Sequence, residues 1–529
     1  MSKQGFLYGT LVLVGAGFIT KVLGFIYRIA LSRIIGDEGM GLFQMAFPIL
    51  IFTIVITTAG LPVAISKLVS EAEAKNEEYR IRSILIVSIL IVIITSVVIT
   101  SGVLLAAPII ASTLLTDERA IYSLLAIAPM IPIIAISSIF RGYFQGRQHM
   151  SPYATSMIIE QFIRIFTVLL LAQYLLPIGI EYAAAGAMIG MVIGEFAGMM
   201  FLIYSFKKDP KRPSLHFSAK KEKKEKSKGF LRRFGSTTRD LLGIAIPVSA
   251  SRTVGSLSYA IEPIVVSQSL AMAGIATATA TALYGRLEGM ALPLVFFPSF
   301  FAYSISVSLV PAISEAAAQK NIQLVEYRFQ QAFRLALIVC SPCSLMMFVM
   351  AEPLSVLLYH QAEVARLMQI IAPFAIFAYL QGPFASVLQG LDQARVAMRN
   401  SIIGAIVKTG LIFVLASRPE LGIDGVALAI NCGMIIVTVL HFIAIAKIIP
   451  FTLRVQELLK LGIAIIITGL VAKQLLLQEQ IPLLSRTMLT TIGSVTVYLI
   501  CMFVLSLIRK DDVSRIPYVG KWMSNILPR

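Results

Sequence analysis

Two stretches of the chain, 250 residues apart, carry nearly the same residues in the same order. Self-similarity of this kind in an apolar chain is typical of membrane transporters that are built from internal repeats. The repeats therefore predict two related lobes, with a binding site between them. The matching pieces are Glu38–Leu42 and Glu288–Leu292, Phe47-Pro48 and Phe297-Pro298, the hexamers at 61–66 and 309–314, and Gln145-Gly146 and Gln389-Gly390.

Composition places these lobes in a membrane. Hydrophobic residues make up 57% of the 529 residues, only 14% are charged, and the mean hydropathy is +0.85. A soluble protein of this size needs far more polar surface. Apolar runs of about 20 residues, the length of a spanning helix, give about fourteen candidate helices, so the predicted fold is all-α. The predicted spans are 6–31, 41–65, 83–110, 120–141, 153–175, 182–205, 241–268, 280–312, 331–350, 364–389, 397–416, 423–447, 458–477 and 484–507.

The spans group into two six-helix lobes, which the repeat relates to each other, and a final helix pair. A strongly basic segment separates the two lobes. The predicted domains are an N-terminal lobe at 1–206, an inter-lobe loop at 207–239, a C-terminal lobe at 240–448, an additional helix pair at 449–510 and a tail at 511–529.

Lysine and arginine in the short loops predict the orientation, because cytoplasmic loops carry an excess of these residues. The even-numbered loops are basic and the odd-numbered loops lean acidic, so we expect both termini on the cytoplasmic side of the cell membrane. The loop 207–239 holds thirteen basic and three acidic residues. It matches no nucleic-acid-binding motif and favours anionic membrane lipids as its partner. The tail, which contains Trp522, predicts an amphipathic helix at the same interface.

Six cations inside the predicted spans are selected by their depth and by the repeat symmetry, because a buried charge at bilayer depth costs at least about 2.5–3.5 kcal/mol and so needs a reason. Lys21 and Arg28 are seven residues apart and share a helical face within about 20°, with Gly24 leaving room between them. Arg252 precedes Gly255 as Lys21 precedes Gly24. Cations in a low-dielectric cavity bind anions strongly. The predicted substrate-binding residues are Lys21, Arg28, Arg164, Arg252, Arg286 and Lys408.

Three acids inside the spans, Glu160, Glu195 and Glu262, are candidates for binding a coupling proton or cation. Glu160 lies four residues before Arg164, a spacing at which the two charges can neutralise each other, so a structural pair is an equal alternative. Glu262 precedes Pro263 and equally fits a helix kink. The four histidines show no metal-ligand spacing. Cys340 and Cys343 have the spacing of a redox motif but lie in an apolar run around a proline, which favours a packing role, so neither a metal nor a cofactor is expected.

Four blocks of the sequence carry a resemblance to the multidrug/oligosaccharidyl-lipid/polysaccharide exporter superfamily. They are Thr20–Phe25, Tyr27–Gly36, Glu38–Phe43 and Gly60–Lys67, and they most resemble sporulation members of the polysaccharide branch. The resemblance implies two six-helix bundles, a final helix pair and alternating access. It implies outward transport, without catalysis, of an undecaprenyl-diphosphate-linked saccharide for spore cortex synthesis. It also implies cell-wall synthesis proteins as possible partners.

Two cavity cations of the lipid II flippase branch have counterparts here. Lys21, in the Val-Leu-Gly-Phe block, matches one of them, and Arg286, in Tyr-Gly-Arg-Leu at 284–287, resembles the other. The chain departs from that branch because the span 41–65 has no arginine and because Arg28 is shifted by one position. The resemblance therefore leaves the saccharide headgroup open.

Three other functions stay open on the sequence. A cation-coupled multidrug exporter shares the fold but requires buried acids rather than an excess of buried cations. A membrane glycosyltransferase or polymerase requires metal ligands or paired carboxylates in sizeable external loops, whereas most of the predicted external loops have about ten residues or fewer. A non-transporting scaffold protein, which would sit in the membrane to bind partner proteins, requires none of these residues.

Overall fold

The computed structural model describes residues 3–58, 60–210, 212–213, 227–450 and 455–507. Contacts divide the chain into two compact units, 1–289 with 417–422, and 290–416 with 423–529. The predicted lobe boundary at 207–239 lies partly outside the described residues, and the predicted domain division stays a prediction. The predicted tail at 511–529 lies wholly outside them.

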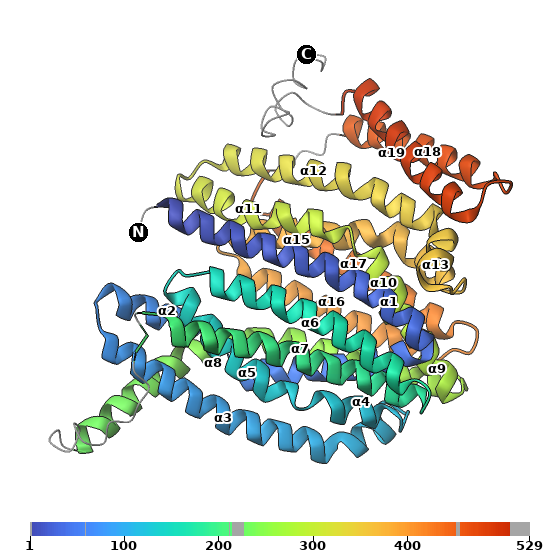
Figure 1. The fold of residues 1–529 in the computed structure, drawn as a ribbon. Coiled ribbons are helices and arrows are strands. Elements are labelled where there is room, and N and C mark those ends of the chain that lie inside the picture. The colour runs from blue at the N-terminus through green and yellow to red at the C-terminus, as the bar shows by residue number, and fades with distance from the viewer. Residues whose placement is uncertain (1–2, 59, 211, 214–226, 451–454, 508–529) are drawn as a thin grey trace. The chain divides into compact units, whose positions relative to one another are not determined.

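The first unit consists of helices throughout its described part (Figure 1). Two of its helices pass into short π-helical turns. The helices are α1 Lys3–Thr58, α2 Leu61–Ala74, α3 Glu78–Ile109, α4 Ala120–Ile127, α5 Met130–Gly146, α6 Ser151–Leu175, α7 Ile180–Lys208, α8 Ser227–Met272 and α9 Thr277–Tyr284, and the π-helical turns are Ile110–Leu114 and Gly285–Ala291.

The second unit is also helical in the residues that the structure describes. In it α18 and α19 pack against each other, and α18 packs on α12 (Figure 1). The helices are α10 Leu292–Val295, α11 Ser299–Ala318, α12 Ile322–Val349, α13 Ala351–Tyr359, α14 Val364–Ile371, α15 Ala375–Gly390, α16 Ala394–Ala416, α17 Gly422–Ala446, α18 Val455–Leu476 and α19 Leu483–Val504.

The described residues contain twelve helices that are long and apolar enough to cross a membrane, or up to thirteen with the bent pair in α8. The predicted all-α membrane fold is confirmed, whereas the count of about fourteen is not. The spans predicted at 6–31 and 41–65 are joined in α1, which kinks at Gly36 (φ 65°). The span predicted at 280–312 is broken near Pro293 and Pro298, because proline supplies no backbone N–H for the helix ladder.

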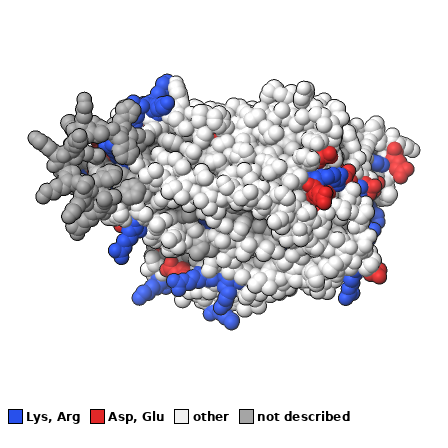
Figure 2. Space-filling model, turned by 90° about the horizontal axis from the view of Figure 1, so that it is seen from below, with Lys and Arg blue, Asp and Glu red and all other residues white. Residues whose placement is uncertain are grey.

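Apolar side chains cover much of the outer surface of these helices. On α3, for example, Leu105 is 80% exposed and Ile109 is 64% exposed. Charged side chains are sparse across the middle of the face in Figure 2 and gather toward its ends. Exposed apolar surface of this extent is stable in hydrocarbon rather than in water. The chain is therefore a multi-pass membrane protein.

The two copies of the repeated segment meet inside the first unit. A Cβ added to Gly41 would overlap the carbonyl oxygen of Thr281, and one added to Gly285 would overlap that of Asp37. The Gln44 amide also donates a hydrogen bond of 2.9 Å to the Glu288 carbonyl. Only glycine permits so close an approach of two backbones. The repeat therefore forms the crossing of α1 with α9 and the π-helical turn that follows it.

An ion-pair network fixes the loop between α3 and α4 to this crossing. Arg119 contacts Asp117 at 2.9 Å and Glu38 at 2.6 Å. Thr281 donates a hydrogen bond of 2.7 Å to Asp117, which is 2% exposed. Burial disfavours ionisation of Asp117, but the hydrogen bonds from Arg119 and Thr281 outweigh burial and lower its pKa.

A row of glycines on α7 brings this helix close to α6. Gly186, Gly190, Gly194 and Gly198 recur at every fourth position and so share one helical face. A Cβ added to Gly190 would lie 2.5 Å from the Val168 Cα, and those added to the other three would also crowd α6. Small residues at such spacing let helices pack closely in membranes. We call this contact the glycine seam.

We predict that Gly190→Leu disrupts the glycine seam. A leucine has no room at this position, so the variant should lose at least about 2 kcal/mol of folding free energy. The measurement is the midpoint of thermal unfolding of the purified protein in nanodiscs. Gly102→Leu on α3 is the matched control, because a Cβ there would meet no atom within 4 Å. Equal midpoints for the two variants would contradict the close packing of α6 and α7.

We also predict that Asp117 stabilises the fold in a pH-dependent manner. Its pKa is lower in the folded protein than its ordinary value of 3.8, so its contribution is present above that value and is lost as the pH falls through the folded pKa. Asp117→Asn should lose about 2 kcal/mol near neutral pH, because the hydrogen bonds to a charged carboxylate are lost. Unfolding midpoints measured from pH 7 downward should converge for the two proteins in acid. A constant difference would exclude this contribution.

Candidate functional site

Three of the predicted cations lie on two helices of the first unit that pack together. Lys21 and Arg28 lie on α1, and Arg252 lies on α8. The Arg28 guanidinium is within electrostatic range of the Tyr259 phenol on α8, seven residues beyond Arg252. Among the described residues, no carboxylate forms an ion pair with Arg28 or Arg252. We call Lys21, Arg28 and Arg252 the cation strip.

Glycines beside the cation strip leave space open. A Cβ added to Gly17 or Gly255 would meet no atom within 4 Å. A Cβ added to Gly24 would come near only the Gln161 amide nitrogen, at 3.7 Å. The expected room next to Lys21 and Arg28 is therefore present in the structure.

Two acidic groups lie near the Arg28 end of the strip, and neither forms an ion pair with Arg28. Glu262, the predicted coupling residue on α8, is buried. Glu262 and Glu288 are both within electrostatic range of the Tyr259 phenol and of the buried Tyr284 phenol. The structure thus brings Glu262 into the neighbourhood of Arg28 but into no ion pair with it.

Arg164 lies in a different environment, a closed ring of four charges in α5, α6 and α7. The Arg141 Nη2 contacts Glu160 at 3.0 Å and Glu195 at 2.8 Å. The Arg164 Nη2 contacts the other oxygens of both carboxylates, with Glu195 at 3.6 Å. Glu195 is 2% exposed. We call Arg141, Glu160, Arg164 and Glu195 the charge ring.

The glycine seam builds this ring. A Cβ added to Gly194 would lie 2.6 Å from the Arg164 Cβ, and one added to Gly198 would lie 3.0 Å from the Glu160 Cβ. The stems of both side chains therefore rest directly on the backbone of α7. The expected pairing of Glu160 with Arg164 is present, and it includes two partners from other helices.

The last two predicted cations lie apart from the strip. Arg286, in the π-helical turn after α9, donates a hydrogen bond of 2.7 Å to Asp37 beside the kink of α1. Lys408 belongs to the second unit, on α16, where its side-chain stem packs on Gly433 of α17. Five of the six predicted cations thus lie in the first unit, and their convergence on one cavity with Lys408 stays a prediction.

Sequence reasoning missed Arg141. The predicted span 120–141 ends at this residue, which placed it in a cytoplasmic loop, whereas α5 continues to Gly146. The signal lay in the apolar aromatic residues Phe140, Tyr143 and Phe144 around it, all of which are buried. A cation among such residues belongs to a helix interior rather than to a loop.

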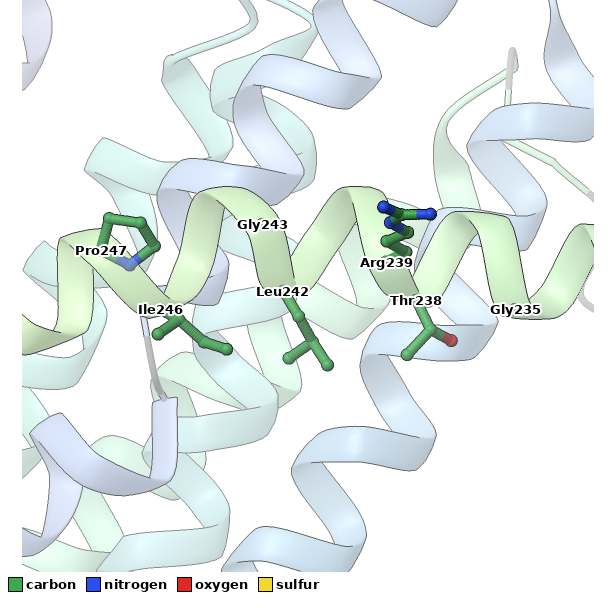
Figure 3. Close-up of a pocket in the computed structure, with 7 residues that line it drawn as sticks. All are labelled: Gly235, Thr238, Arg239, Leu242, Gly243, Ile246 and Pro247. Carbon is green, nitrogen blue, oxygen red and sulfur yellow. The ribbon is translucent and has the colours of Figure 1, made fainter.

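An open hollow of about 810 Å³ lies beside α8, and Figure 3 shows seven residues that line it. Leu242, Ile246 and Pro247 line it, and Arg239 stands toward one end. Its described walls all come from this one helix and are mostly apolar. Such a surface suits a lipid chain better than a sugar headgroup, so it is not assigned as the headgroup site.

Comparisons with known proteins agree with this fold. The family model described as "Polysaccharide biosynthesis protein" matches residues 6–317, and the MatE model matches residues 288–414. Stage V sporulation protein B of Bacillus subtilis (strain 168) is 44% identical over 98% of this chain and 99% of its own length. The lipid II flippase MurJ of the same organism is 24% identical over 83% of this chain and 82% of its own length.

A solved structure, "Lipid II flippase MurJ, inward closed conformation", has the same fold, with a TM-score of 0.70 at 16% identity. The match covers 94% of this chain and all of that one (100%). The relative and the solved structure just described are named as flippases, not as enzymes. The chain belongs to the polysaccharide branch of the multidrug/oligosaccharidyl-lipid/polysaccharide exporter superfamily, in the family of stage V sporulation protein B.

Proposed function

We propose that the protein moves an undecaprenyl-diphosphate-linked saccharide outward across the cell membrane by alternating access. The cation strip carries the proposal. Lys21, Arg28 and Arg252 lie within spanning helices beside open space, and no described carboxylate pairs with either arginine. Cations at this depth are costly unless an anion joins them. A diphosphate is an anion of the right kind, because it offers several oxygens to guanidinium and ammonium donors.

The rest of the substrate fits the same surroundings. The open space beside Gly17, Gly24 and Gly255 supports the placement of the saccharide headgroup next to the cation strip. The prenyl chain stays in the hydrocarbon, so only the headgroup needs a polar path. Transport then requires that the cation strip binds the diphosphate more tightly in one conformation than in the other.

The relatives support the biological setting of this proposal. One is named for sporulation and another as a lipid II flippase. We therefore place the substrate among precursors for the spore cortex and name cell-wall synthesis proteins as candidate partners. Both termini lie in the cytoplasm in this proposal, so that the basic loop at 207–239 contacts the inner headgroups.

The other predicted contacts act at later stages in this proposal. Arg164 and Arg286 already have carboxylate partners, so each has to exchange a partner before it can contact a diphosphate. Lys408, on α16, stays a predicted substrate-binding residue in this proposal. Glu160, Glu195 and Glu262 are the proposed ion-coupling groups.

The MatE match over 288–414 favours a second candidate, a cation-coupled multidrug exporter. Its organic cations need buried acids without cationic partners. Glu160 and Glu195 are both held by arginines, which makes them poor ligands for such substrates. The cation strip would also repel them.

We predict that Lys21→Ala/Arg252→Ala abolishes recognition of the diphosphate. Each lost charge-assisted contact is worth about 1.5–3 kcal/mol, so the double variant should bind at least about 100-fold more weakly. The measurement is native mass spectrometry of the purified protein with undecaprenyl-diphosphate sugars and, separately, with organic cations.

Arg33→Ala is the matched control, because Arg33 is an exposed cation on the same helix outside the strip. It should retain the polyprenyl diphosphates. Equal binding by the double variant and the parent protein would refute the site. Retention of organic cations alone would replace the flippase with the drug exporter.

A further inference from the structure

The charge ring is closed, and all of its carboxylate oxygens face guanidinium nitrogens. Arg141 Nη2 lies 3.0 Å from Glu160 Oε2 and 2.8 Å from Glu195 Oε1. Arg164 Nη2 hydrogen-bonds Glu160 Oε1 and lies 3.6 Å from Glu195 Oε2. With both glutamates ionised, the ring has no net charge. Glu195 Oε2 is then the oxygen with the weakest contact.

The ring lies well inside the spanning segments. Glu160 is nine residues beyond the first residue of α6, a rise of about 14 Å. Glu195 is fifteen residues beyond the first residue of α7. Side chains at this depth have little access to water, so the net charge of the ring matters strongly for stability.

The same geometry excludes a metal cation from the ring. Each carboxylate oxygen already faces a guanidinium, so a cation would find no unoccupied oxygen and two repelling charges. In the described part of the chain, no group of three or more His, Cys, Asp or Glu side chains could hold a metal ion. A proton needs only one oxygen and no coordination shell.

The two carboxylates also lie side by side, because both contact the same nitrogen, Arg141 Nη2, at 3.0 Å and 2.8 Å. Two ionised carboxylates at that separation repel, whereas a carboxylic acid donates to a carboxylate. We propose that Glu160 and Glu195 bind one proton between them and that the charge ring is the proton-coupling site of the transporter. This inference rests on the proposed transport function and names its coupling ion.

A hydronium ion donates the proton: one of its O–H bonds breaks and leaves water, and an O–H bond forms at a carboxylate oxygen, Glu195 Oε2 in the first instance. No other bond changes. The ring charge changes from 0 to +1, because two arginines then face one remaining negative charge. This excess charge favours a conformation in which one arginine leaves the ring.

The ring also adjoins the cation strip. Gln161, the residue after Glu160, is 5% exposed, and its amide nitrogen is the group that approaches Gly24 on α1. That nitrogen has no hydrogen-bond partner among the described residues. A shift of α6 when the ring gains a proton therefore reaches the helix that carries Lys21 and Arg28.

The charged neighbours of the pair come from two helices. They are Arg141 of α5 and Arg164 of α6, and the Tyr153 ring of α6 lies 5.6 Å from the Arg141 guanidinium carbon. Two more helices, α1 and α4, also pack on α7. On α1, Lys21 and Arg28 belong to the cation strip, Arg33 is exposed, and Asp37 and Glu38 pair with Arg286 and Arg119. On α4, Tyr122 contacts Tyr182.

The test is infrared difference spectroscopy of the full-length protein in nanodiscs between about pH 8 and about pH 6, a range in which ordinary carboxyls stay ionised. The parent protein should gain the carbonyl band of one protonated carboxylic acid per chain. Glu195→Gln should lose that band. Glu181→Gln is the matched control, because Glu181 lies in the first turn of the same helix outside the ring, and it should keep the band.

A second variant keeps the test decisive if Glu195→Gln fails to fold. Arg141→Gln/Glu195→Gln removes one charge of each sign and leaves Glu160 paired with Arg164, so it should fold and show no band. A band that persists in the double variant, or its absence from the parent protein, would overturn the proton site.

The failure of this inference is distinguishable from the failure of the proposed function. Binding of undecaprenyl-diphosphate sugars is measured on the same samples by native mass spectrometry. Sugar-lipid binding without the carboxyl band would refute proton coupling alone. The band without sugar-lipid binding would support the proton site and refute the proposed substrate.

Discussion

A charge inside a bilayer must have a compensating charge or a polar path to water, and this constraint governs the first unit. The charge ring satisfies it with two arginines and two glutamates from three helices. Arg286 satisfies it with Asp37. Both solutions need helices that approach closely, and glycines provide that approach at α6 and α7 and at the repeat crossing. The positions of the charged residues in this unit therefore depend on the positions of the glycines.

Against this background, Arg28 and Arg252 stand out. Other arginines of the first unit at comparable depth have carboxylate partners, whereas these two have none among the described residues. Guanidinium groups that lie within spanning helices and have no carboxylate partner are available to an anionic ligand that binds from outside the protein. The substrate proposal rests on the two arginines without a carboxylate partner. The proton proposal rests on the paired charges of the charge ring. The two proposals share one residue, Arg164, which belongs to the charge ring and is a later contact of the diphosphate.

Much of the fold can be predicted from the sequence, because the length of an apolar run and the order of the repeated segments are visible in contiguous residues. The membrane helices were predictable for that reason, and so was the room beside Lys21, since Gly24 lies one turn away. Glu160 and Arg164 were also recognisable, because four residues separate them on one helix. Arg286 and Asp37 were not, because 249 residues separate them and only tertiary packing joins them. Arg141 was misplaced because hydropathy ended its span early.

The crossing of Gly41 and Gly285 has a consequence for the history of the chain. Two copies of one ancestral segment have become each other's packing surface. A bulkier residue in either copy would push the backbone of the other, so the copies cannot diverge independently at this point. Duplication usually frees one copy to change while the other preserves the original role. Here the two copies pack against each other, so a change at either glycine is restricted by the backbone of the other copy.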